Sequence, residues 1–94
     1  MSHAKLDYSW SKGGFENVML ATFIITNPTS RTIKDVEITC THFAASGTKI
    51  DENTRTIYQI VPAKGKKRIP DFNMGLIHSQ AKSSACTISD LVVQ

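Results

Sequence analysis

Short runs of β-branched and aromatic residues, separated by turn-forming residues every ~8–12 positions, are the feature that most constrains how this chain folds. No segment shows the periodicity of an amphipathic helix. The expected strands cover residues 6–10, 15–26, 33–43, 48–50, 54–61, 66–74 and 85–93. This spacing predicts an all-β fold, an antiparallel β-sandwich of about seven strands.

The chain length sets the scale of the fold. We expect residues 1–94 to form a single domain, with residues 1–5 either disordered or introduced by cloning. A chain of this size buries roughly 60–65 % of its unfolded surface, so a covalent crosslink would add a large share of its stability. The net charge of +3 suits solubility, and we do not expect a nucleic-acid partner. No apolar run is long enough to span a membrane, although a longer parent protein can still be anchored.

Residues 33–43 show the clearest alternation of apolar and polar side chains. Because side chains of a strand point to alternate faces, Val36, Ile38 and Cys40 are predicted to share the core face. His42 has the same parity but lies at the end of the strand. We therefore expect its ring to reach solvent.

Two later segments carry irregularities. Pro70 has no backbone N–H, which predicts an edge strand or a bulge for residues 66–74. In the last strand the alternation changes phase at Ser89 and Asp90. Residues 75–84 are expected to form a loop or a single helical turn.

The two cysteines, Cys40 and Cys86, fall on inward positions of well-separated strands. In a sandwich such residues can approach closely enough to form a disulfide. The chain-entropy model assigns about 4 kcal/mol to closing a loop of this length. We predict the disulfide for an oxidising compartment; in a reducing one the two residues would be separate buried thiols.

A metal or redox centre is the alternative use of Cys40, His42 and Cys86, with His78 as a further candidate ligand. Residues two apart in a strand face the same way, so Cys40 and His42 could share an ion. Their spacing does not match the close cysteine pairs of zinc sites, nor the cysteine–histidine–methionine order of cupredoxin-type copper sites. We predict no cofactor and keep the metal site as the alternative.

Catalytic motifs are not found in the sequence. Cys40 is predicted to be buried, whereas a catalytic cysteine needs exposure and thiolate character. No serine lies in a Gly-x-Ser-x-Gly sequence, and no glycine-rich phosphate loop is present. We expect a protein that is not an enzyme.

The only charge run is formed by Lys64, Lys66, Lys67 and Arg68. Four cations at this spacing can bind phosphates or anionic lipid headgroups. Lysines on a hairpin also protect a sheet edge from pairing with other chains, and no aromatic residue for base stacking lies close by. We favour edge protection and keep anionic binding as an alternative.

Tyr8 and Trp10 lie close together near the start of the chain, before two glycines. Trp10 could be presented to a ligand or partner, because exposed aromatic side chains anchor interfaces. The two residues share parity, which favours packing of both side chains on the sandwich.

Three motifs from residue 27 onward occur in a recognisable order. They are Asn-Pro-Thr-Ser-Arg-Thr-Ile-Lys-Asp-Val-Glu-Ile-Thr at 27–39, Phe-Ala-Ala-Ser-Gly-Thr-Lys-Ile at 43–50, and Ile-Val-Pro-Ala-Lys-Gly at 60–65 before a strand with Phe72. This order resembles FxLYD-type domains, small immunoglobulin-like sandwiches of bacterial envelope proteins. Ala44 and Ala45 stand where that family has tyrosine and aspartate. The resemblance implies an immunoglobulin-like fold and an envelope setting, and it brings no catalytic residues.

Together these features predict a non-enzymatic binding or scaffolding module of the bacterial cell envelope, in the periplasm or associated with the envelope. Its partner would be a protein, and the chain itself a monomer or weak dimer. The alternatives are the small metal or redox protein built on Cys40, His42 and Cys86, and an anionic-surface binder acting through residues 64–68.

Overall fold

The computed structural model describes residues 4–14 and 17–94, and these residues form β-strands and no helix. The strands are β1 (Lys5–Gly13), β2 (Val18–Thr26), β3 (Ile33–Phe43), β4 (Lys49–Val61), β5 (Lys66–Leu76) and β6 (Ser83–Val93). The predicted all-β class is therefore confirmed. Among the described residues there is accordingly no helix that could cross a membrane.

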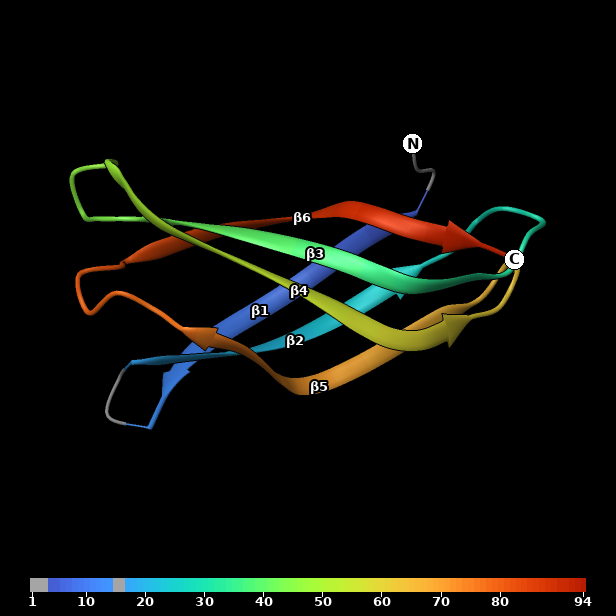
Figure 1. Cartoon of the computed structure of the whole chain (residues 1–94), viewed down its shortest axis with the longest axis horizontal. Helices are drawn as coiled ribbons and strands as arrows, with labels where there is room; N and C mark the ends of the chain where they lie inside the picture. The colour runs from blue at the N-terminus through green and yellow to red at the C-terminus, as the bar shows by residue number, and fades with distance from the viewer. Residues whose placement is uncertain (1–3, 15–16) are drawn as a thin grey trace.

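The strands form two three-stranded antiparallel sheets (Figure 1). Sheet A has the order β1-β2-β5 and sheet B the order β4-β3-β6. Edge strands of the two sheets also contact each other, β4 with β5 and β1 with β6. The result is a sandwich whose two sides are partly closed.

The strand count differs from the predicted seven because residues 48–50 and 54–61, expected as two strands, mostly belong to the single long strand β4. The polar residues between them, Asp51, Glu52 and Asn53, continue the strand and pair with β3. β4 is an edge strand of sheet B, where polar side chains are easily accommodated.

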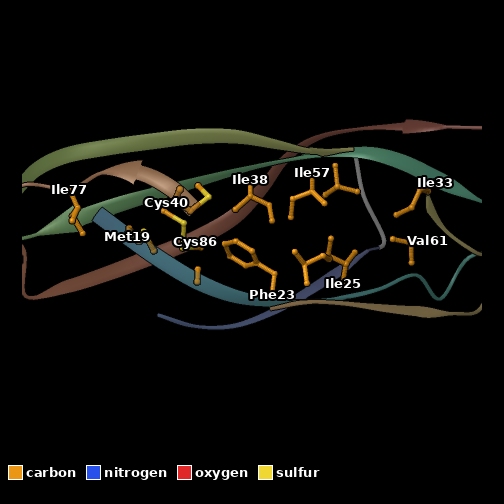
Figure 2. Packing of buried hydrophobic residues seen from close by; sticks show 14 of the residues in the cluster. Met19, Phe23, Ile25, Ile33, Ile38, Cys40, Ile57, Val61, Ile77 and Cys86 are labelled. Atoms are coloured by element: carbon orange, nitrogen blue, oxygen red, sulfur yellow. A yellow bond between two sulfur atoms is a disulfide. The ribbon is translucent and has the colours of Figure 1, made fainter. Parts of the chain in front are cut away.

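The core lies between the two sheets (Figure 2). β2 runs through the centre of sheet A and buries every second residue; these residues are Met19, Ala21, Phe23 and Ile25. From sheet B, Val36, Ile38 and Cys40 of β3 are fully buried, which confirms the predicted core face.

β5 has both features that Pro70 predicts. It is an edge strand of sheet A, and its pairing with β2 is irregular around Pro70. Ala21 pairs with Phe72 and Phe23 pairs with Ile69, so Pro70 and its neighbour lie opposite a single residue of β2. This arrangement is a β-bulge, in which a missing N–H does not interrupt the ladder.

The phase change predicted at the end of the chain is also present. Ile38 pairs with Ile88 and Glu37 pairs with Asp90, so Ser89 is an extra residue in β6. Beyond this bulge Leu91 packs partly against the core. The bulge therefore returns an apolar side chain to the inner face after the alternation has slipped.

No strand is predicted for residues 75–84 or for residues 1–5. Residues 77–82 form a loop without a helical turn, and Ile77 and Ala81 within it are buried. Near the start, Lys5 begins β1 and Ala4 packs partly against the core, whereas residues 1–3 lie outside the described part.

Candidate functional site

Cys40 and Cys86 form a disulfide, as predicted (Figure 2). They are direct partners in the pairing of β3 with β6, and their Cα atoms lie 4.0 Å apart. The expectation of well-separated strands is wrong, because the bond joins neighbours within sheet B. In antibody domains, by contrast, the disulfide joins the two sheets. Here it fixes the register of β3 against β6.

His42 is fully buried, so the prediction that its ring reaches solvent is wrong. Its Nδ1 lies 2.6 Å from Oγ of Ser84 on β6, and its Nε2 lies 2.8 Å from Oδ1 of Asn53 on β4. β3 is the central strand of sheet B, so neighbours on both sides cover its end. The ring is thus enclosed with a partner for each nitrogen, as a buried polar group requires.

The orientation of the Asn53 side chain determines which nitrogen of His42 carries the proton. Nδ2 of Asn53 lies 2.9 Å from the backbone oxygen of Met74 and 2.7 Å from that of Leu76, and so donates to both. Its Oδ1 can only accept, so Nε2–H of His42 donates to it. In the neutral ring Nδ1 then accepts a hydrogen bond from the hydroxyl of Ser84.

This hydrogen-bonded cluster of His42, Asn53 and Ser84 connects the two sheets. Its members lie on three strands of sheet B, and the carbonyls that Asn53 binds belong to β5 of sheet A. The cluster closes the side of the sandwich where β4 and β5 meet. Sequence reasoning missed Asn53 by treating it as part of a break, although it shares parity with the core residue Ile57.

The same contacts bear on the metal hypothesis. Both sulfur atoms are bonded to each other and both nitrogens of His42 have hydrogen-bond partners. Ligation by Cys40, His42 and Cys86 would require reduction of the disulfide and loss of those hydrogen bonds. His78 lies in an exposed loop, where its Nδ1 accepts from the N–H of Gln80 at 3.0 Å. Within residues 4–14 and 17–94 no group of three or more His, Cys, Asp or Glu side chains is placed to hold a metal ion.

Trp10 lies half-buried on the inner face of β1 and packs against the core cluster. Its ring centroid is 6.5 Å from that of His42. Tyr8, of the same parity, is more exposed. The packing interpretation of Trp10 is therefore the one that its surroundings support.

The four basic residues of 64–68 do not point in one direction. Lys64 lies in the turn before β5, and Lys66 and Arg68 are exposed on the outer face of sheet A. Lys67 is half-buried and pairs with Ile25, a residue of the inner face. β5 is an edge strand, as the edge-protection interpretation requires.

A group of exposed apolar side chains on the outer face of sheet B was not singled out from the sequence. We call Tyr58, Ile60 and Val92 the sheet B patch; their exposed fractions are 80%, 55% and 44%. Ile60 and Val92 flank Lys34 in one row across the sheet, because both pair with it. The alternation of side chains in β4 is the sequence signal that indicates this patch. Tyr58 and Ile60 have the opposite parity to the buried Ile57 and Val61, so they are expected on the outer face.

Comparisons with family models, curated proteins and solved structures gave no significant match.

Proposed function

We propose that this chain is a non-enzymatic binding or scaffolding module of the bacterial cell envelope, built as an immunoglobulin-like sandwich with six strands. The observation that carries the proposal is the sheet B patch of Tyr58, Ile60 and Val92. Tyrosine is enriched at protein interfaces because it combines a large apolar surface with a hydroxyl. A side chain as exposed as Tyr58 gains most when a partner covers it.

The position of the patch suits a protein partner. Tyr58 and Ile60 belong to β4, an edge strand of sheet B. An edge strand also offers backbone donors and acceptors to an approaching chain. Lys34 lies between Ile60 and Val92 in the pairing, and the aliphatic part of a lysine side chain is able to extend an apolar surface. We expect binding through this face, with the chain otherwise a monomer or weak dimer.

The Cys40–Cys86 disulfide supports the proposed envelope location, since disulfides persist in oxidising compartments such as the periplasm. It is compatible with a location outside the cytoplasm. The resemblance to FxLYD-type domains supports the envelope in particular. Thiol trapping tests this part: in bacteria quenched with acid and then denatured, both cysteines should resist alkylation until a reductant is added. Alkylation without reductant would contradict the envelope setting.

Site-specific photocrosslinking tests the binding role. A photoreactive residue replaces Tyr58 in one variant and Ser9, which is exposed on β1 of sheet A, in the control. We expect a discrete adduct with another protein from position 58 and none from position 9. Equal labelling from both positions, or none from either, would contradict a binding role for sheet B. An adduct of twice the chain mass would mean self-association instead.

The metal or redox function of Cys40, His42 and Cys86 remains the alternative proposal. Its test is metal analysis of the protein purified without reductant or chelator. A stoichiometric metal together with free thiols would favour it over the binding module. A mass that rises by about 2 Da on reduction, without metal, would favour the crosslink.

A further inference from the structure

The outer face of sheet A brings together cations that are far apart in the sequence. Lys5 of β1 and Lys66 of β5 both pair with Thr26 of β2, so the three residues form one row across the sheet. In the next row on the same face, Asp7 and Arg68 both pair with Ile24. Lys5, Lys66 and Arg68 are exposed, and we call them the sheet A basic face.

These cations have no paired acid in the described part of the chain. The one ion pair among the described residues joins Lys49 to Glu52 in sheet B. Two acids lie near them: Asp7 lies across Ile24 from Arg68, and the exposed Asp71 lies in the β5 bulge opposite Thr22, whose hydroxyl accepts from its N–H. The face therefore keeps a positive excess that a partner can neutralise.

Aliphatic side chains occupy the rest of the same face. Val18, Leu20 and Ile24 alternate with the buried residues of β2 and are half-buried. Leu76 of β5 pairs with Val18 and is 71% exposed. Protection of the sheet edge accounts for lysines on β5, but it does not account for an exposed leucine on the same surface.

We propose that the outer face of sheet A docks onto an anionic lipid surface, with Lys5, Lys66 and Arg68 against the headgroups and Leu76 at the apolar boundary. This goes beyond the proposed function, since it uses the other sheet and leaves the sheet B patch free for a protein partner. Each basic side chain near an anionic membrane strengthens binding about fivefold, so three give about a hundredfold at low salt. Aliphatic side chains add the contact with lipid that distinguishes membrane binding from simple polyanion binding.

A lipid is favoured over a nucleic acid or an anionic glycan. Binding of single-stranded nucleic acid relies on aromatic stacking, and no described aromatic side chain lies on this face. An anionic glycan would engage the cations but gain little from Val18, Leu20 and Leu76. A sheet face with cations in two rows and aliphatic residues between and beyond them matches the interface of a bilayer.

The test is co-sedimentation of the whole chain with vesicles of phosphatidylcholine alone and with vesicles containing about a third phosphatidylglycerol. The test variant combines Lys5→Gln, Lys66→Gln and Arg68→Gln. The control combines Lys34→Gln, Lys49→Gln and Lys82→Gln, which removes the same charge from elsewhere on the molecule. Circular dichroism and an intact disulfide confirm that each variant is folded.

We expect binding to the anionic vesicles alone, weakening as salt rises from about 50 to about 200 mM. The test variant should lose about a hundredfold in affinity and the control only a few-fold. Leu76→Gln should weaken vesicle binding several-fold without changing retention on heparin. Equal losses in the two triple variants, or no binding to anionic vesicles at low salt, would overturn the proposal. Tighter binding to heparin or single-stranded DNA than to anionic vesicles, together with unchanged vesicle binding by Leu76→Gln, would overturn the proposal in favour of a polyanion.

Discussion

Nε2 of the buried His42 donates to Oδ1 of Asn53 across 2.8 Å, while the amide of Asn53 donates to the backbone of β5. A polar side chain of sheet B thereby satisfies a core histidine and two carbonyls of sheet A at once. In the low dielectric of the interior such a network stabilises only when every member has a partner. We therefore expect the stability of the sandwich to depend strongly on the side chain of Asn53.

Asn53→Ala should lower the free energy of unfolding by about 2–4 kcal/mol, because the N–H of His42 loses its acceptor, the Leu76 carbonyl loses its side-chain donor, and the Met74 carbonyl keeps only the long contact with Arg55. The neighbouring Thr54→Ala is the control. Thr54 is exposed and its hydroxyl contacts only that of Thr39, so its loss should cost less than about 1 kcal/mol. Urea titration of both variants measures the difference. Similar costs for the two would mean that the cluster does not hold the sheets together.

The β5 strand passes close to the same cluster at Gly75, which has φ +100. A Cβ at this position would lie 3.0 Å from a guanidinium nitrogen of Arg55 and 3.3 Å from Nδ2 of Asn53. Gly47 has a similar φ of +90 but open space around it. Alanine substitutions at Gly75 and Gly47 therefore separate the cost of backbone strain from the cost of steric crowding.

Gly47→Ala should cost about 1 kcal/mol, the typical strain of a left-handed conformation for a residue with a Cβ. Gly75→Ala should cost about 1–3 kcal/mol more, because the alanine also displaces Arg55 and Asn53. Thermal or urea unfolding of the two variants gives the comparison. Equal destabilisation by the two variants would show that Arg55 and Asn53 move away from position 75 at little cost in free energy.

Much of the fold could be predicted from local pattern. The alternation through Val36, Ile38 and Cys40 predicts the core face, and Pro70 predicts an edge and a bulge. Each of these signals is contained in a few consecutive residues. The phase change at Ser89 belongs to the same class, because an extra residue in a strand is visible as a slip in the alternation.

The candidate site could be predicted only in part, because its contacts depend on the register between strands. Cys40 and His42 were singled out, but the partners of His42 come from β4 and β6. Nothing in residues 33–43 indicates which side chains lie opposite them. Asn53 in a run of polar residues has the pattern of a turn, and its parity with Ile57 indicates an inward position only when the strand is known to continue through it, as the pairing with Cys40 shows.

Removal of the disulfide by Cys40→Ala with Cys86→Ala should lower the free energy of unfolding by about 4 kcal/mol in the chain-entropy model. A reductant should destabilise the parent protein to a similar extent and leave the double variant unchanged. Guanidinium titrations with and without reductant provide the measurement. If reductant leaves the midpoint of the parent protein unchanged while its mass rises by about 2 Da, the crosslink does not contribute to stability.

Asn27 organises the opposite end of the sandwich from a position that is 1% exposed. Its Nδ2 contacts three backbone oxygens, those of Arg31, Val61 and Pro62. Its Oδ1 accepts from both the N–H and the hydroxyl of Thr29. The side chain therefore joins the loop after β2 to the end of β4.

Asn27→Asp preserves the shape of this side chain but replaces the amide donor with an acceptor that faces three carbonyl oxygens. We expect a loss of about 3 kcal/mol or more in the free energy of unfolding, because a buried charge is left opposite acceptors. Asn73→Asp is the matched control. Its Oδ1 only accepts from the N–H of Gly75 at an exposed site, which a carboxylate does equally well, so the cost should stay below about 0.5 kcal/mol. Urea titration measures both, and equal costs would contradict the assigned role of the Asn27 amide.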